Sequence, residues 1–299
     1  MDDAKKTRSK ETKEIQWHPA FVVAIQALLI EYKDVLEYKL EHPLTTGSLV
    51  IDMLVIKKRP DAEVKKQIAE IFRQDNILEY KSPTGSLSIN EFYRAFARAF
   101  LHMALYDIDI ADLTLSFVVT VHPRDLFKHL RVKLGCTVNK RHPGVFSVTG
   151  AIIPIQIIDI RKLSDDENLW LRNLDRNLSE NNLLWAHNMK KKHGEQIDLN
   201  AWLQAVFNAN YKVIKEIFSK EVNSMLTTGM RKTLEEIGLA AQWEKKGIEK
   251  GIEKGIEKGI EEGRLKTARA MIAEGFDIKI TSRVTEIPVK RLKKELQAQ

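Results

Sequence analysis

The tetrapeptide Leu-Glu-Tyr-Lys occurs twice in the chain, at Leu36–Lys39 and at Leu78–Lys81. Only the second copy follows a strand-like apolar run that carries one acid, Asp52, in its middle. An aspartate on one strand and Glu-x-Lys on the next would bring two carboxylates and an ammonium group together. Two carboxylates can bind a divalent cation, and an ammonium group can stabilise the charge of a phosphate. The candidate catalytic residues are therefore Asp52, Glu79 and Lys81.

Glu-x-Lys is frequent in this chain, so the spacing alone does not select a site. The triplet begins at Glu11, Glu31, Glu37, Glu63, Glu79 and Glu244. Four of the six fall in a charged tail, on expected helices or in a repeat, and residues two apart do not share a face of a helix. On a strand they do, because side chains alternate with a period of two. Glu37 is surrounded by charged residues, as on a solvated edge strand, which leaves Glu79 as the better candidate.

The apolar neighbours of the two acids leave two interpretations open. Asp52 has the parity of Leu54 along its strand, and Glu79 and Lys81 have the parity of Ile77. A carboxylate on an apolar face is costly unless it is paired or bound to a metal. We expect Asp52 and Glu79 to face the same way. They would form either a metal site or a buried salt bridge with Lys81 that has no catalytic role.

A metal site would use each of these groups. The carboxylates of Asp52 and Glu79 and the backbone carbonyl of Tyr80 are hard oxygen ligands that suit Mg²⁺, for which Mn²⁺ can substitute. Lys81 would position or help to deprotonate a bound water and stabilise the charge of the transition state. The first helix would supply a further acid, and Glu31, near the end of that helix, is the candidate.

The elements that must position these residues follow from hydrophobic periodicity and turn residues. Together they predict a mixed α/β domain over residues 15–163, preceded by a disordered tail at residues 1–14. The expected helices are His18–Lys33, Ala62–Arg73, Ile89–Leu105 and Arg124–Leu134. The expected strands are Val35–Leu44, Ser48–Lys57, Asn76–Ser82, Leu113–His122, Gly144–Val148 and Ile152–Ile160.

The rest of the chain is expected to be all helical. Residues 164–243 are rich in helix formers, and their aromatic residues are expected to form a packed core. In residues 244–263 the unit Lys-Gly-Ile-Glu repeats, with glycine at every fourth position. Glycine lowers helix stability by up to about 1 kcal/mol per position, so this segment is either a helix packed against a partner, such as a second copy of the chain, or a charged linker.

Residues 264–299 predict two short helices joined by a tight turn at Thr285–Pro288, as in helix-turn-helix proteins. The second of these helices carries four basic residues that are candidates for DNA contacts, namely Lys290, Arg291, Lys293 and Lys294.

The composition excludes several classes of protein. The 299 residues are 43% hydrophobic and carry a formal net charge of +7, which fits a polyanionic partner only weakly. A single cysteine, Cys136, excludes an intramolecular disulfide and indicates a reducing, cytoplasmic environment. No apolar run reaches the ~18 residues of a membrane helix, so no membrane association is expected. The sequence contains no Walker loop, H-E-x-x-H or G-x-S-x-G motif, so no nucleotide cofactor, zinc-protease site or serine-hydrolase site is expected.

With these motifs in this order, the chain resembles the PD-(D/E)XK nuclease superfamily, and within it the Rpn-like (recombination-promoting nuclease, transposase-like) proteins of bacteria. The matching segments are Ile51-Asp52 and Ile77-Leu-Glu79-Tyr-Lys81-Ser-Pro83, with the glycine-punctuated repeat and the small helical tail. Ile51 stands where the proline of the motif is expected. The resemblance implies a restriction-endonuclease-like core of helix, three strands, helix and strand. It also implies Mg²⁺-dependent DNA endonuclease activity, with roles in recombination, mobile-element biology or phage defence.

A second function remains open at this point. A protein with the same fold but no activity could bind DNA through its helix-turn-helix-like tail and act as a regulator. The complete set of Asp52, Glu79 and Lys81 favours the enzyme, because a protein without activity has no need to keep all three.

Overall fold

The computed structural model describes residues 15–40, 53–220 and 225–297. They fall into two compact units, residues 1–233 and 234–299. The first unit contains the sheet, whose strands are β1 (Leu36–Leu40), β2 (Met53–Lys58), β3 (Asp75–Lys81), β4 (Leu113–Val119), β5 (Thr137–His142), β6 (Val145–Thr149) and β7 (Ile155–Asp159). Its α-helices are α1 (Trp17–Leu28), α2 (Ile89–Tyr106), α3 (Arg124–Val132), α4 (Asp165–Arg172), α5 (Glu180–His193), α6 (Asn200–Ala209), α7 (Tyr211–Lys220) and α8 (Met225–Glu236).

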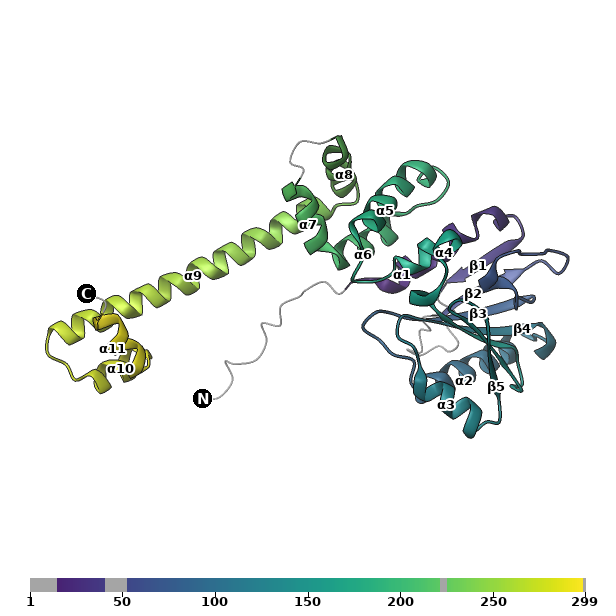
Figure 1. Cartoon of the computed structure of the whole chain (residues 1–299), viewed down its shortest axis with the longest axis horizontal. Coiled ribbons are helices and arrows are strands. Elements are labelled where there is room, and N and C mark those ends of the chain that lie inside the picture. Colours follow the sequence, from purple (N-terminus) through teal and green to yellow (C-terminus); the bar gives the residue numbers. More distant parts are fainter. Residues whose placement is uncertain (1–14, 41–52, 221–224, 298–299) are drawn as a thin grey trace. The chain divides into compact units, whose positions relative to one another are not determined.

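The seven strands form one mixed sheet in the order β1-β2-β3-β4-β7-β6-β5 (Figure 1). Strands β3, β4 and β7 are parallel, and the pairs on either side of them are antiparallel. Along the chain the elements α1, β1, β2, β3, α2 and β4 follow one another as helix, three strands, helix and strand, as expected from the sequence. The mixed α/β class is therefore confirmed.

The three parallel strands form the centre of the sheet and are buried on both faces, which explains the largely apolar sequences of β4 and β7. Strand β3 is also buried but carries three charged residues, Asp75, Glu79 and Lys81. Their register aligns side chains in rows across the sheet. Ile77, Leu115 and Ile155 form one row, and on the same face the next row is Glu79, Phe117 and Ile157. The third row on this face is Lys81, Val119 and Asp159. We call the face that carries these three rows the α2 face.

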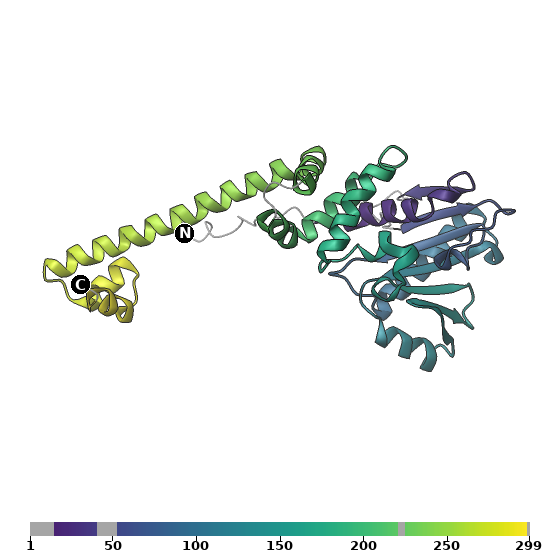
Figure 2. The same cartoon turned by 45° about the horizontal axis from the view of Figure 1, so that its top comes forward.

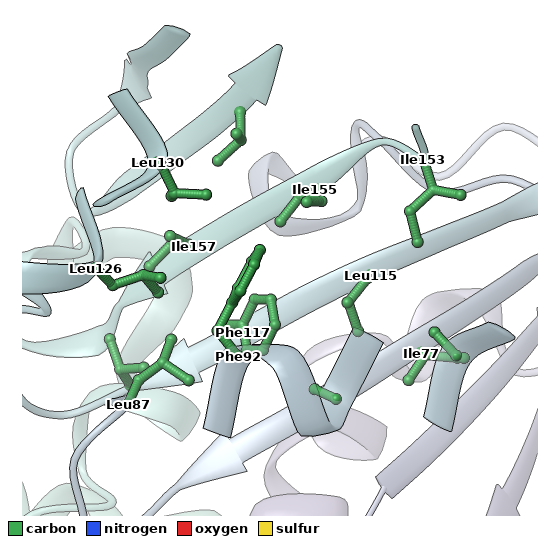
Figure 3. Close-up of a cluster of buried hydrophobic side chains, with 14 of the residues drawn as sticks. Ile77, Leu87, Phe92, Leu115, Phe117, Leu126, Leu130, Ile153, Ile155 and Ile157 are labelled. Carbon is green, nitrogen blue, oxygen red and sulfur yellow. The ribbon is translucent and has the colours of Figure 1, made fainter. Parts of the chain in front are cut away.

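Helices α2 and α3 cover the α2 face and complete its hydrophobic core. Phe92 of α2 packs against Phe117 of β4 with ring centroids 5.5 Å apart, and Leu126 and Leu130 of α3 join the same cluster (Figure 3). Burying a large apolar side chain contributes about 1.5–3 kcal/mol, so this cluster accounts for a large share of the driving force for folding.

Helix α2 begins and ends at residues that favour helix termini. The hydroxyl of Ser88 accepts a hydrogen bond from the backbone N–H of Glu91, which satisfies one of the free donors of the first turn. The helix ends at Asp107, which has a left-handed backbone conformation with φ of 51°. These two positions set where α2 begins and ends.

The opposite face of the sheet, which carries Leu78 and Tyr80, packs against α1. The ring of Tyr80 stacks on that of Phe21 at 4.6 Å, with an angle of 3° between the planes. Helices α4 and α6 pack in turn against α1, and Trp202 of α6 is fully buried beside Trp170. The prediction that the aromatic residues after residue 163 form a core is confirmed for these two.

Several predictions about the elements are wrong. The helix expected at Ala62–Arg73 is reduced to one 3₁₀ turn, Gln67–Ala69. Strand β5 was not expected, because its sequence, Thr-Val-Asn-Lys-Arg-His, is mostly polar and exposed, as an edge strand allows. The expected tail at residues 1–14 and most of the run that contains Asp52 lie outside the described residues.

The second unit consists of α9 (Leu239–Ala273), α10 (Ile278–Thr285) and α11 (Val289–Gln297). The repeat is helical, and it lies within the 35 residues of α9 (Figure 2). Its isoleucines stay 53–58% exposed, at Ile248, Ile252, Ile256 and Ile260. Apart from the adjacent residues and the nearby backbone of α9 itself, no atom of the described residues would lie within 4 Å of a Cβ added to the glycines of the repeat.

Helices α10 and α11 pack against the end of α9 around a small core of Ala268, Ile287 and Leu292. The turn between them contains Glu286, which has a left-handed backbone conformation with φ of 58°, followed by Ile287 and Pro288. Two short helices joined by a tight turn were expected here from the sequence. Among the described residues, no helix is both long and apolar enough to cross a membrane.

Candidate functional site

The carboxyl end of β3 brings Glu79 and Lys81 together, as the sequence predicts. Both side chains lie on the α2 face, and Lys81 Nζ is 2.9 Å from Glu79 Oε1. Glu79 is 3% exposed, in the same row as Phe117 and Ile157. A carboxylate in such a row is stable only if its charge is balanced.

Helix α2 supplies the other charged side chains that balance the charges of Glu79 and Lys81. Arg98 Nη2 donates a hydrogen bond of 2.8 Å to the second oxygen of Glu79. Glu91, in the first turn of α2, accepts a hydrogen bond of 2.5 Å from Lys81, and its other oxygen lies 2.6 Å from Arg94. These five residues alternate in charge and form one connected network, which we call the β3–α2 cluster.

The charge of Lys81 follows from this network. Burial by itself would lower the pKa of Lys81, but the carboxylates of Glu79 and Glu91 outweigh it and raise the pKa above its ordinary value. The hydrogen bond from Lys81 conversely lowers the pKa of Glu91, against a smaller opposite effect of burial, and Arg94 lowers it further. In this state Lys81 is an ammonium at neutral pH.

Glu91, Arg94 and Arg98 were missed by the analysis of the sequence. A signal for them existed, because they recur at i, i+3 and i+7 on the helix that follows the Glu-x-Lys strand, and such residues share one face. Ser88 and Glu91 also have the spacing of a capping box. What the sequence could not show is that the carboxylate of Glu91 turns to Lys81.

The strand register corrects the argument from parity. Met53 is the residue opposite Glu79, and Leu54 lies opposite Leu78. Residues directly opposite each other in an antiparallel pair share a face, so Leu54 faces α1 and not the β3–α2 cluster. Parity within each strand does not fix the phase between two strands, so the parity of Leu54 gives no argument for the side on which Asp52 lies. Asp52 itself, the residue before Met53 in the sequence, lies outside the described residues.

Of the two other candidates in the nuclease-like domain, Glu31 lies apart from this cluster and Tyr80 adjoins it only through its backbone. Glu31 is in the 3₁₀ turn Ile30–Tyr32, its side chain is 69% exposed, and its partner is Lys66 Nζ at 3.6 Å. Its contacts among the described residues do not include Glu79 or Lys81. The side chain of Tyr80 points to α1, while its backbone lies in the stretch of β3 that pairs with β4.

The first Leu-Glu-Tyr-Lys copy occupies the environment that its charged neighbours predicted. Strand β1 is at the edge of the sheet. Glu37 is 65% exposed and Lys39 is 35% exposed, with 3.6 Å between the ammonium and the carboxylate. The two copies of the motif therefore form an exposed pair and a buried pair.

The tail residues Lys290, Arg291, Lys293 and Lys294 are exposed on α11. Lys290, Lys293 and Lys294 have the i, i+3, i+4 spacing of one helix face. Arg291 forms an ion pair with Glu261 of α9. Three of the four basic residues thus form a single basic surface.

Comparison of the chain with known protein families, with curated proteins and with solved structures found no match.

Proposed function

We propose that the chain is a Mg²⁺-dependent DNA endonuclease with a restriction-endonuclease-like core, acting in the cytoplasm in recombination, mobile-element biology or phage defence. The observation that supports this most strongly is the buried pair of Glu79 and Lys81 at the carboxyl end of β3. Glu-x-Lys on the third strand, after a helix and two strands, is the arrangement that the sequence resemblance led us to expect.

The fit of a magnesium ion depends on the donor set. Glu79 and the backbone of Tyr80 offer hard oxygens of the kind that Mg²⁺ prefers, and Mn²⁺ accepts the same donors. The described residues contain no group of three or more side chains able to hold a metal, so the site we propose also needs Asp52. A bound ion would lower the pKa of a coordinated water and neutralise charge on the phosphate.

The residues of the β3–α2 cluster have separate tasks in this proposal. Arg98 holds the carboxylate of Glu79 in a fixed position, and Glu91 holds the ammonium of Lys81. Because the pKa of Lys81 is raised, its ammonium donates hydrogen bonds to the attacking water and to the phosphate rather than taking a proton. Its positive charge then stabilises the negative charge that develops on the phosphate oxygens.

The test is cleavage of supercoiled plasmid by the purified full chain with Mg²⁺ or Mn²⁺, and with EDTA as the metal-free control. We expect metal-dependent nicking, reduced by about 10²–10³-fold in Glu79→Gln. The matched control is Glu37→Gln, which makes the same change in the exposed copy of the motif and should cut like the unmodified protein. Absence of cutting under every metal condition would contradict the proposal.

A second candidate function is DNA binding without cleavage. The specific observation in its favour is the basic surface of Lys290, Lys293 and Lys294 on a short helix that follows a tight turn. Replacing Lys293 and Lys294 by alanine should weaken DNA affinity and flatten its dependence on salt, because each lysine that contacts a phosphate releases counterions. Alanine at the exposed Lys212 and Lys215 of α7 removes the same charge elsewhere and serves as the control. DNA affinity with no cleavage in any metal would favour this second function.

A further inference from the structure

A groove of about 690 Å³ lies beyond the carboxyl ends of β3 and β4. Its walls are the segment after β3, Ser86–Asn90, and the segment after β4, Val121–Asp125. The crevice beyond the carboxyl ends of parallel strands is where ligands commonly bind in open α/β sheets. The groove adjoins the β3–α2 cluster, because Asn90, in its wall, is followed directly by Glu91.

A second cluster of charged residues stands at this groove. Asp159 at the end of β7 is 2% exposed, and its Oδ2 lies 3.0 Å from His122 Nδ1 and 3.1 Å from Lys162 Nζ. The same ammonium is 3.0 Å from His122 Nδ1. Asp159 shares its row of the sheet with Lys81, with Val119 between them. Two strand spacings put the Cα atoms of Asp159 and Lys81 about 10 Å apart on one face.

The position of the His122 ring is fixed by its neighbours. The ring packs edge-to-face against Phe127, with ring centroids 5.0 Å apart and an angle of 77° between the planes. It packs in the same way against Phe146, at 5.7 Å and 61°. Two aromatic contacts in these orientations limit rotation of the imidazole. His122 is therefore held in one orientation at the wall of the groove.

Gly144 holds the backbone that carries Asp159 and Lys162. It has φ of +75° and accepts a hydrogen bond of 2.8 Å from the backbone N–H of Asp159. A Cβ at this position would lie 2.6 Å from the carbonyl oxygen of Asp159 and 2.7 Å from the nitrogen of Leu163. Only glycine allows this approach, which fixes the segment that positions the second cluster.

The contacts of His122 occupy one of its two ring nitrogens. Nδ1 lies 3.0 Å from the ammonium of Lys162, which can only donate, and 3.0 Å from Asp159 Oδ2, which can only accept. Nε2 has no hydrogen-bond partner among the described residues, so it is the ring nitrogen available to a ligand, and a proton on it would be donated to a phosphate oxygen.

The character of the site favours an anion over a metal ion. The Lys162 ammonium already occupies the space between His122 and Asp159, and no metal-binding group of three side chains exists in the described part of the chain. The groove wall also contains Arg124 and the hydroxyls of Ser86 and Ser88, against one acid, Asp125. Hydrogen-bond donors therefore predominate at this wall, while its two formal charges, on Arg124 and Asp125, balance.

We propose that the groove is a phosphate-binding subsite in which His122 Nε2 and the guanidinium of Arg124 hold a phosphate of the nucleic-acid strand whose neighbouring phosphates reach Lys81. The inference rests on the proposed function. One strand of B-form DNA has one charge per 3.4 Å of helix axis, so the ~10 Å between the Cα atoms of Asp159 and Lys81 corresponds to about three nucleotides. The subsite would set the register of the strand relative to the β3–α2 cluster.

The test measures binding in the presence of EDTA, so that binding at this subsite is observed without metal-dependent cleavage. Binding of a fluorescent single-stranded oligonucleotide to the full chain is followed by anisotropy, with Arg124→Ala and His122→Gln as variants. We expect Arg124→Ala to weaken binding by about tenfold, since hydrogen bonds to charged groups contribute about 1.5–3 kcal/mol. The controls are Arg131→Ala and His129→Ala, which lie later on α3 and outside the groove wall.

The resonances of the eight histidines distinguish the source of the phosphate. In a histidine-labelled protein, the His122 signal, assigned through His122→Gln, should shift on addition of the oligonucleotide. A shift with inorganic phosphate but none with the oligonucleotide would overturn the proposal of a nucleic-acid subsite.

Unchanged affinity in Arg124→Ala and an unmoved His122 signal would likewise overturn it, even if the protein cuts DNA. Weakened binding in Arg124→Ala with a shifted His122 signal would support it, even if the protein does not cut.

Discussion

Lys81 Nζ donates a hydrogen bond of 2.5 Å to Glu91 Oε2, and this contact joins the end of β3 to the first turn of α2. The same ammonium lies 2.9 Å from Glu79. Lys81 therefore has a carboxylate from its own strand and a second carboxylate from the helix that covers it. This arrangement accounts for the raised pKa of Lys81 and makes α2 part of the candidate site.

Arg98 and Arg94 offer a matched comparison on one helix. Arg98→Ala would leave the buried carboxylate of Glu79 with one cation instead of two, so we expect the free energy of unfolding to fall by about 2–3 kcal/mol. Arg94 is 68% exposed, and Arg94→Ala should cost less than about 1 kcal/mol. Urea unfolding of both variants measures the difference. An equal decrease in the free energy of unfolding in both variants would show that the buried carboxylate of Glu79 does not need Arg98 to balance its charge.

The site could be predicted from the sequence only in part. The choice of Glu79-x-Lys81 over Glu37-x-Lys39 could be made from neighbouring charges, because an edge strand and a central strand differ in composition. The pairing register of β2 with β3 could not be predicted, because the sequence of each strand alone does not show which of their residues lie opposite each other. Met53, rather than a residue of the parity of Leu54, lies opposite Glu79.

Much of the fold followed from local patterns. The parallel strands β4 and β7 are largely apolar, β3 combines apolar with charged residues, and all three strands were predicted. The exposed strand β5 was not predicted, because its sequence is mostly polar, and the segment around Gln67–Ala69 was wrongly predicted as a helix. Glu70, just after Gln67–Ala69, lies 2.6 Å from His142 at the end of β5. Such a contact, across 72 residues of chain, leaves no local signal.

The raised pKa of Lys81 has a consequence for stability at alkaline pH. Since the folded-state pKa lies above the ordinary value of 10.5, the stabilisation from this group is fully present below that pH and is lost as the pH rises through the folded-state pKa. We expect the difference in unfolding free energy between the unmodified protein and Lys81→Met to be constant up to about pH 10 and to narrow above it. Chemical unfolding at a series of pH values measures this. A difference that widens above pH 10.5 would contradict the assigned direction.

The repeat predicts self-association of the chain. Four isoleucines of α9 are more than half exposed, and lysine and glutamate alternate around them in the sequence. A second copy of this helix could cover the isoleucines and pair opposite charges, and the glycines would allow close approach. We therefore propose a homo-oligomer formed through the repeat. Sedimentation velocity should show a dimer or larger species that dissociates in the double variant Ile252→Ser, Ile256→Ser.

The control for this experiment is Ile280→Ser with Val284→Ser, which changes two exposed apolar residues of α10. A monomer at all concentrations of the unmodified protein would exclude the assembly. If both double variants dissociated the oligomer, the contact between the copies would not be specific to the repeat.

The most direct test of the account compares two lysines that occur in the same tetrapeptide. Plasmid nicking is measured with Mg²⁺ for the full chain and for Lys81→Ala and Lys39→Ala. We predict that Lys81→Ala loses at least about 10²-fold in rate, because it removes the ammonium that stabilises charge on the phosphate, and that Lys39→Ala cuts as fast as the unmodified protein. Equal loss in both variants, or no loss in Lys81→Ala, would contradict the assignment of the buried pair as the catalytic centre.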